Sequence, residues 1–190
     1  MKHRPNTLRI IGGNWRGRRV SFPDVDGLRP TGDRIRETVF NWLQAYTPGA
    51  RCLDLFSGSG AMGLEALSRG AESVVFVERN AAAAAATRTA LATFGVDNGQ
   101  VLQADALRFL ETPTGSFDIV FIDPPFGADI ISKCCELLEQ HHWLKPGALI
   151  YMEQDRAKAV PSIPDNWTMH RQAHAGQVAY YLARRHEEAI

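Results

Sequence analysis

A carboxylate, two prolines and an aromatic ring follow an apolar run in the second half of the chain. Asp123, Pro124, Pro125 and Phe126 come directly after residues 117–122. An apolar run of that length is typical of a buried strand, and proline ends it because proline has no N–H to give the ladder. We therefore expect Asp123 at the carboxyl end of a strand, where open α/β sheets bind their ligands.

The chemistry that this turn suits is the activation of a planar amine. The lone pair of an exocyclic amine on a nucleobase is delocalised into the ring, so the amine is a poor nucleophile. A carboxylate and a carbonyl that accept its two N–H bonds would free the lone pair, and Phe126 could stack on the base. The alternative interpretation is a capped strand end followed by an ordinary turn.

A glycine-rich segment follows an earlier strand-like run. Gly58, Gly60 and Gly63 have the spacing that allows a tight turn, close approach of the backbone to a ligand and close packing of a helix on a strand. Glu78 comes twenty residues after Gly58, at the end of the next apolar run, where it could take both ribose hydroxyls of an adenosine cofactor. Dinucleotide and S-adenosylmethionine sites share this fingerprint, so it does not choose between them.

Strand and helix patterns alternate up to about residue 153, which predicts an α/β fold with a doubly wound, mostly parallel sheet. The fifth strand of this sheet is expected at residues 148–152, after a turn at residues 145–147. A terminal antiparallel hairpin is expected at residues 167–172 and 177–183.

The first 48 residues predict a small extension of this domain. Residues 8–22 have the pattern of two short strands around a glycine-rich turn, and the following helix should run to about Tyr46, on the same face as Leu43. We therefore divide the chain into a basic hairpin-and-helix extension, residues 1–48, and a cofactor-binding domain, residues 49–190.

Charge is unevenly distributed along a chain whose formal net charge is zero. Residues 1–36 carry nine Lys or Arg against three Asp, a local net charge of +6, so the remainder carries −6. Arginines interleaved with an aromatic residue can hold RNA backbones and stack on unpaired bases, although a solvated hairpin with one anchoring indole is the alternative. The candidate RNA-binding residues are Arg9, Trp15, Arg16, Arg18, Arg19, Arg29 and Arg34.

Other classes of site and compartment have little support. Three cysteines give no disulfide framework. The side chains of the adjacent His141 and His142 cannot bind one metal ion together, so we expect no metal site. No stretch approaches the roughly 20 apolar residues of a membrane helix. We therefore expect a soluble, cytoplasmic protein with no membrane partner.

With these motifs in place, the chain resembles the bacterial enzymes that methylate the N2 amine of a guanine in 16S ribosomal RNA. The matching stretches are residues 9–13 with 16–18, residues 28–31 with 33–38, and residues 53–67, 117–126 and 176–180. The segment around Arg29, Pro30 and Thr31 and the N-terminal arm are more specific to that family than the glycine loop.

The resemblance implies a class I, Rossmann-like methyltransferase that uses S-adenosylmethionine. Asp123, Pro124, Pro125 and Phe126 would present the guanine. The cofactor would be held by Asp54, Phe56, Gly58, Gly60, Glu78, Asp105 and Ala106. The partner would be 16S ribosomal RNA within an assembled or assembling small ribosomal subunit, bound by a monomeric enzyme.

Three other functions share parts of this pattern. A nicotinamide dehydrogenase would use the glycine loop but would leave residues 123–126 unexplained. A methyltransferase for adenine N6 or for a protein glutamine shares the turn, but the glutamine enzymes usually carry Asn in place of Asp123, and the DNA enzymes usually add a recognition domain. A non-catalytic RNA-binding module would have no reason to keep Asp54, Glu78 and Asp105 each at a strand end.

Overall fold

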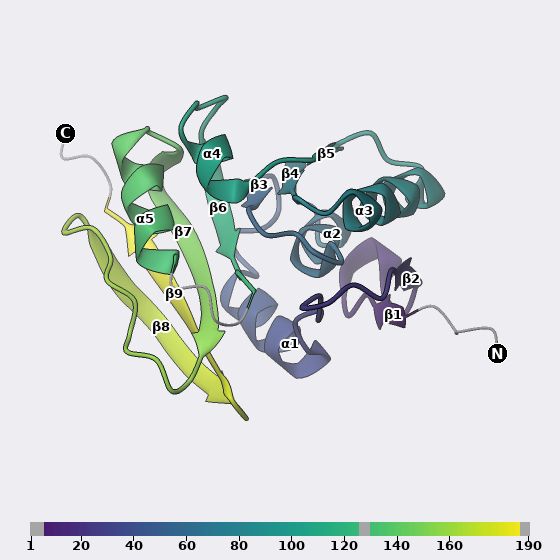
Figure 1. Ribbon diagram of the computed structural model, residues 1–190, viewed down its shortest axis with the longest axis horizontal. Helices are drawn as coiled ribbons and strands as arrows, with labels where there is room; N and C mark the ends of the chain where they lie inside the picture. Colours follow the sequence, from purple (N-terminus) through teal and green to yellow (C-terminus); the bar gives the residue numbers. More distant parts are fainter. Residues whose placement is uncertain (1–5, 126–129, 187–190) are drawn as a thin grey trace.

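The computed structural model describes residues 6–125 and 130–186 (Figure 1). Strands and helices alternate along most of the chain, as the sequence predicts. The elements are β1 (Asn6–Arg9), a 3₁₀ turn (Gly13–Trp15), β2 (Arg19–Phe22), α1 (Asp33–Trp42), β3 (Arg51–Asp54), α2 (Ala61–Ser68), β4 (Ser73–Val77), α3 (Ala81–Phe94), β5 (Gly99–Leu102), α4 (Ala106–Leu110), β6 (Phe117–Ile122), α5 (Ile131–Gln140), β7 (Leu144–Asp155), β8 (Trp167–Ala175) and β9 (Val178–Arg185).

Seven strands form one sheet in the order β5-β4-β3-β6-β7-β9-β8. The first five of these strands are parallel, and β9 and β8 add an antiparallel hairpin at one edge. The direction of winding reverses between β3 and β6, so the carboxyl ends of these two strands flank the point at which open α/β sheets bind ligands. The predicted fold class is confirmed.

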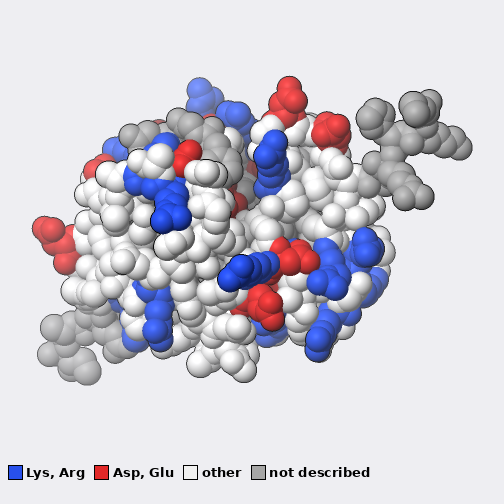
Figure 2. Space-filling model, turned by 90° about the horizontal axis from the view of Figure 1, so that it is seen from below, with Lys and Arg blue, Asp and Glu red and all other residues white. Residues whose placement is uncertain are grey.

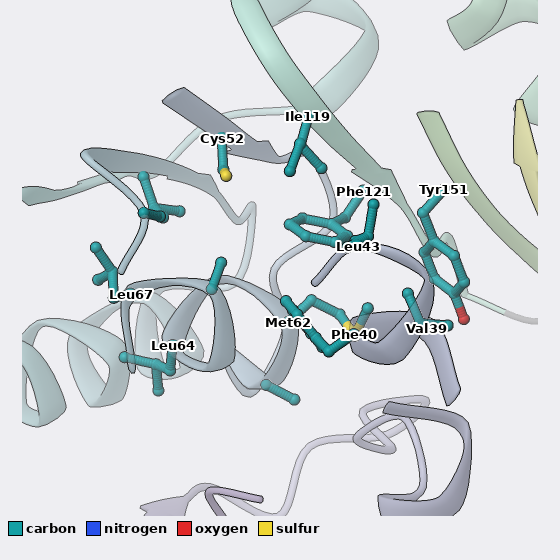
Figure 3. Close-up of a cluster of buried hydrophobic side chains, with 14 of the residues drawn as sticks. Val39, Phe40, Leu43, Cys52, Met62, Leu64, Leu67, Ile119, Phe121 and Tyr151 are labelled. Carbon is teal, nitrogen blue, oxygen red and sulfur yellow. The ribbon is translucent and has the colours of Figure 1, made fainter. Parts of the chain in front are cut away.

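Alternate residues of the central strands face two hydrophobic layers. Phe121 and Tyr151 point to the layer that contains α1, α2 and α3, whereas Val120 and Met152 point to the layer that contains α4 and α5. Figure 3 shows the first layer, where side chains of α1 such as Phe40 lie against the sheet residues; the rings of Phe40 and Phe121 are 5.9 Å apart. Helix α1, which belongs to the N-terminal 48 residues, is thus part of the main core.

The N-terminal hairpin packs on α2 and α3, at the end of the molecule opposite β8 (Figure 1). The ring of Trp15 stacks on Phe94 of α3 at a centroid distance of 4.2 Å and an angle of 17°. The fully buried carboxylate of Glu65, on α2, accepts the backbone N–H groups of Ile11 and Gly12 at 3.0 and 2.8 Å. The hairpin is therefore held by both ring stacking and a buried charge.

Two arginines balance that charge. Arg36 is 1% exposed and donates its Nη1 to Glu65 at 3.3 Å, and Arg69 donates its Nε to Glu65 at 2.9 Å. Arg36 also donates to the carbonyl groups of Thr31 and Arg9 at 3.0 and 2.9 Å. These bonds join the hairpin, α2 and the loop that precedes α1.

Three predicted details are wrong. Helix α1 ends at Trp42, and Tyr46 is 42% exposed, because the chain turns there and buries Thr47 instead. Residues 145–147 lie inside β7 and not before it: Phe117 pairs with Leu144 and Ile119 with Leu149, so they form a bulge that accommodates a proline. The terminal hairpin has longer strands than predicted, and only residues 176–177 separate them.

Replacing Glu65 with Gln should lower the free energy of unfolding by about 3 to 5 kcal/mol, because two guanidinium groups lose a buried counter-charge. Glu136→Gln is the matched control, since Glu136 pairs with Lys133 on an exposed helix face and should contribute less than about 1 kcal/mol. Urea denaturation measures both. Equal losses of unfolding free energy in the two variants would contradict the role of Glu65. So would trypsin cleavage at the hairpin arginines of the Glu65→Gln variant at the same rate as in the wild type.

Candidate active site

One cleft of about 440 Å³ lies at the carboxyl ends of the parallel strands. Four acids that the sequence predicts at successive strand ends all line it: Asp54 at the end of β3, Glu78 after β4, Asp105 after β5 and Asp123 after β6. The volume is within the usual range for sites that enclose a small molecule. Phe56, Gly58 and Ala106 also line the cleft.

The glycine loop between β3 and α2 has the backbone geometry that only glycine adopts easily. Gly58 and Gly60 have φ angles of +51° and +79°. A Cβ atom on Gly63 would lie 2.2 Å from the ring of Phe76, so this glycine lets α2 pack closely on β4. The buried hydroxyl of Ser57, in the same loop, has no hydrogen-bond partner within the described ranges, which suits a loop that binds a polar ligand.

Glu78 is held rigidly at the wall of the cleft. Its Oε2 accepts the N–H of Gly58 at 2.8 Å, and its Oε1 accepts the N–H of Asn80 at 2.7 Å. Each carboxylate oxygen keeps a further lone pair, so the group could accept two ribose hydroxyls while it fixes the glycine loop.

Asp54 is 2% exposed at the end of β3. Burial raises the pKa of its carboxyl group to about 7, the N–H of Gly63 at 3.0 Å lowers it, and the negative charge of Glu78 raises it. A cationic group in the cleft would favour the ionised form. S-adenosylmethionine carries two cationic groups, a sulfonium and an ammonium, so the donor set fits this cofactor.

Asp105 has a structural task as well as a place in the cleft. It caps α4, and its Oδ1 accepts the N–H groups of Leu107 and Arg108 at 3.1 Å. Its side chain is exposed to the cleft, where its second oxygen could accept an adenine amino group.

Asp123 lies beside Pro124 and Pro125 where β6 ends, as the sequence predicts. The hydroxyl of Thr31 donates to its Oδ2 at 3.0 Å. Burial raises the pKa of the Asp123 carboxyl well above its usual value, and the nearby carboxyl of Glu153 raises it further. Phe126, the predicted stacking ring, lies outside the described residues.

Thr31 and Glu153 line the cleft but are not among the predicted site residues. Thr31 belongs to the segment around Arg29 and Pro30 that resembles the family, and Glu153 follows the apolar run of the fifth strand. Their proximity to Asp123 depends on contacts between residues 92 and 122 positions apart, which local patterns do not reveal. A signal did exist for Glu153, because it is another acid at the carboxyl end of a parallel strand.

The candidate RNA-binding residues are not all in one place. Arg29 lines the cleft, and Arg9 and Arg19 face each other across the hairpin. Trp15 and Arg18 both contact Phe94, and the guanidinium carbon of Arg18 is 4.1 Å from the ring centroid. These two side chains therefore help to attach the hairpin to α3.

Residues 6–125 and 130–186 contain no group of three or more His, Cys, Asp or Glu that could hold a metal ion. The same ranges also contain no helix long and apolar enough to cross a membrane.

Comparison with known proteins agrees with this geometry. The family model described as "Conserved hypothetical protein 95" matches residues 8–184. Ribosomal RNA small subunit methyltransferase D of Escherichia coli is 47% identical over 178 residues, which cover 94% of this chain and 90% of that protein. The solved structure of the Escherichia coli protein yhhF covers 96% of this chain and 100% of its own at a TM-score of 0.90 and 43% identity.

A more distant structure agrees in fold. It is the 16S rRNA N2 guanine methyltransferase RsmC of Thermus thermophilus, in complex with AdoMet and guanosine. The match includes 97% of this chain and 50% of the RsmC chain, with a TM-score of 0.68 and 20% identity.

The fold and the cleft define the class of protein: it is an S-adenosylmethionine-dependent methyltransferase with a Rossmann-like sheet. The matches that cover nearly the whole chain narrow the class. The chain belongs to the family of ribosomal RNA small subunit methyltransferase D.

The affinity for S-adenosylmethionine should depend on pH through Asp54. Below pH 7 this carboxyl is neutral in the free protein and must lose its proton to bind a cation, so the dissociation constant should rise roughly tenfold for each pH unit below 7 and level off above it. The cofactor's own amino group, with a pKa of about 8, stays protonated in this range.

Calorimetry between pH 5.5 and 7.5 measures this dependence, and Asp54→Asn is the control. The variant should bind more weakly with an affinity that hardly changes with pH. If the dissociation constant of the variant depends on pH as steeply as that of the wild type, a group other than Asp54 is responsible for the titration.

Proposed function

We propose that the protein transfers a methyl group from S-adenosylmethionine to the exocyclic N2 amine of a guanine in 16S ribosomal RNA. The observation that carries this proposal is the position of Asp123 and Pro124 in the same cleft as Asp54 and Glu78. The amine-activating turn and the residues suited to the cofactor thus line one cavity. The names of the relatives, which include small-subunit ribosomal RNA and guanine N2, support the choice of substrate.

In this mechanism the cofactor supplies an electrophilic methyl group on a sulfonium. The protein orients the amine: Asp123 and the carbonyl oxygen of Pro124 accept its two N–H bonds and make the lone pair available. Thr31 holds the Asp123 carboxylate in place at 3.0 Å. The target base must leave its stack, and the sequence-based proposal that Phe126 stacks on it would offset that cost.

The exposed arginines of the hairpin are proposed to hold RNA phosphates. Figure 2 shows Lys and Arg gathered at the end of the molecule where the hairpin lies, beside acidic side chains. Arg9 and Arg19 are exposed and directly opposite each other, which is unfavourable for two like charges. The carboxylate of Asp33, 3.3 Å from Arg9, balances one of them, and a phosphate is proposed to balance the other. The two arginines line a groove of about 310 Å³ that also touches Pro30 and Thr31, residues of the cleft wall.

We further propose that the enzyme works as a monomer, in the cytoplasm, on an assembled or assembling small subunit. The extension of 48 residues is small, and phosphate contacts position a protein without specifying a sequence. The shape of the folded particle would then select the guanine.

Asp123→Ala should lower turnover by roughly 10²–10⁴-fold, as for other positioned acid–base groups, while the affinity for S-adenosylmethionine stays near that of the wild type. Asp97→Ala, an exposed change outside the cleft, is the control. Radiolabelled methyl transfer and calorimetry measure the two quantities. Loss of cofactor binding with normal turnover of the bound complex would refute the role of Asp123.

Substrate chemistry can be tested with the same assay. Inosine at the target position lacks the N2 amine, so methylation there would show that the nitrogen is misassigned. Mass spectrometry of nucleosides from the methylated RNA identifies the product directly.

Arg16→Glu combined with Arg19→Glu should abolish methylation of small subunits that lack the modification, while cofactor binding is unchanged. The wild-type rate should fall steeply with salt because phosphate contacts release counterions. The matched control is Arg156→Glu with Arg171→Glu. These two exposed arginines lie near the β8–β9 edge of the sheet, far from the N-terminal hairpin. Equal or faster methylation of protein-free 16S RNA by the wild type would defeat the proposed particle substrate.

A further inference from the structure

Four polar side chains form a continuous hydrogen-bonded cluster behind the amine-binding turn. Thr31 comes from the loop before α1, Asp123 follows β6, and Tyr151 and Glu153 belong to β7. The register pairs Phe121 with Tyr151, so Asp123 and Glu153 are the next residues on the same face of the two parallel strands. Thr31, Tyr151 and Glu153 are each at most 5% exposed.

Three contacts limit where the hydrogens of this cluster can lie. The Oγ1 of Thr31 lies 3.0 Å from Asp123 Oδ2 and 3.4 Å from Glu153 Oε2, and the hydroxyl of Tyr151 lies 2.6 Å from the same Glu153 oxygen. A threonine hydroxyl has one hydrogen and can donate to only one carboxylate. Both contacts are hydrogen bonds at the same time only if one of the two carboxyl groups is protonated and donates to Oγ1.

Electrostatics agree with the count of hydrogens. Two ionised carboxylates on one buried hydroxyl would repel each other, and such pairs retain a proton. Burial raises the pKa of both Asp123 and Glu153. Hydrogen bonds partly oppose this effect: the bond from Thr31 lowers the pKa of each carboxyl, and the bond from Tyr151 lowers the pKa of Glu153.

Other ionisable groups face the cluster from the neighbouring elements. Asp54, on β3, adds negative charge, and Tyr180, on β9, lies 6.5 Å from the ring of Tyr151. Arg36, on α1, donates to the backbone carbonyl of Thr31, and its other nitrogens bond Arg9, Asp33 and Glu65.

We propose that Asp123 and Glu153 share one proton through the hydroxyl of Thr31, and that Glu153 is a positioning residue for methyl transfer. The hydroxyl of Thr31 lies closer to Asp123, at 3.0 Å, than to Glu153, at 3.4 Å, so its hydrogen is assigned to Asp123. Glu153 then holds the shared proton and donates it to Thr31. The negative charge is thereby kept on Asp123, which faces the amine. This inference rests on the proposed function.

The proton balance of the reaction follows from this arrangement. The N–C bond forms as the C–S bond breaks, and the electron pair of the C–S bond stays on sulfur, which becomes neutral. The nitrogen then carries a positive charge and loses one N–H proton to ionised Asp123. That proton passes to water when the product leaves, and the proton on Glu153 stays in place through the cycle.

Variants of Glu153 separate this role from a purely structural one. The amide of Glu153→Gln can donate to Thr31 as a protonated carboxyl does, so this variant should retain about tenfold more kcat than Glu153→Ala, which lacks a donor. Its acid limb in a plot of kcat against pH should stay near that of the wild type, because the wild-type Glu153 is already neutral and the substitution removes no charge. A limb that shifts to lower pH, or a folded Gln variant as slow as the Ala variant, would overturn the proposal.

The bridge itself can be removed and restored. Thr31→Val should lower kcat on small subunits at least tenfold with little change in cofactor affinity, and Thr31→Ser should recover most of the loss. Thr47→Val is the matched control, because Thr47 is equally buried but bonds the carbonyl of Leu43, away from the cleft. Failure of the Ser variant to recover activity would count against the bridge.

The shared proton can also be measured without any reaction. Carbon-13 NMR titration of the side-chain carboxyl groups should show one proton retained by the Asp123–Glu153 pair at pH 7 in the wild type. If both groups ionise together below pH 5, the proposal fails, whichever substrate the enzyme methylates. If instead the pair holds its proton but the wild-type enzyme transfers no methyl group to guanine N2 of 16S ribosomal RNA, the proposed function fails while the proton-sharing pair stands.

Discussion

The buried carboxylate of Glu65 is the constraint on which the rest of the structure depends. It gathers two backbone N–H groups of the hairpin and two guanidinium groups around one point between α2 and α1. Arg36 extends this centre to the carbonyl of Thr31, whose hydroxyl reaches Asp123. A continuous set of hydrogen bonds therefore runs from the basic hairpin to Asp123, and the wall of the cleft cannot shift without disturbing a buried charge.

Much of the fold and of the cleft was predictable because the relevant signals are local. Proline ended β6 at the expected residue, and the glycines before α2 have positive φ angles where a tight turn was expected. An acid at the end of a parallel strand lies at the same edge of the sheet as acids at the ends of its neighbours. Asp54, Glu78, Asp105 and Asp123 were therefore brought together by topology alone, before any side-chain contact was known.

The remainder was not predictable because it depends on partners distant in sequence. The sequence around Glu65 is that of an ordinary helix. It gives no sign that the carboxylate accepts hydrogen bonds from Ile11 and Gly12, which lie 54 and 53 positions earlier in the chain. Glu153 and Thr31 became site residues only when β7 and the loop before α1 met at Asp123. The bulge at residues 145–147 was not predicted for a similar reason. A proline and a glycine normally mark the end of a strand, but here β7 pairs with β6 both before and after them.

Helix α3 gives the enzyme a fixed internal length. It is capped by Asn80, whose N–H donates to Glu78 at the wall of the cleft, and it ends at Phe94, on which the hairpin stacks. Its 14 residues, many of them alanine, span about 21 Å of stiff helix. The Glu78 side of the cleft and the basic hairpin are thus attached to the two ends of one stiff helix, so the number of turns in α3 sets the distance between the cleft and the hairpin.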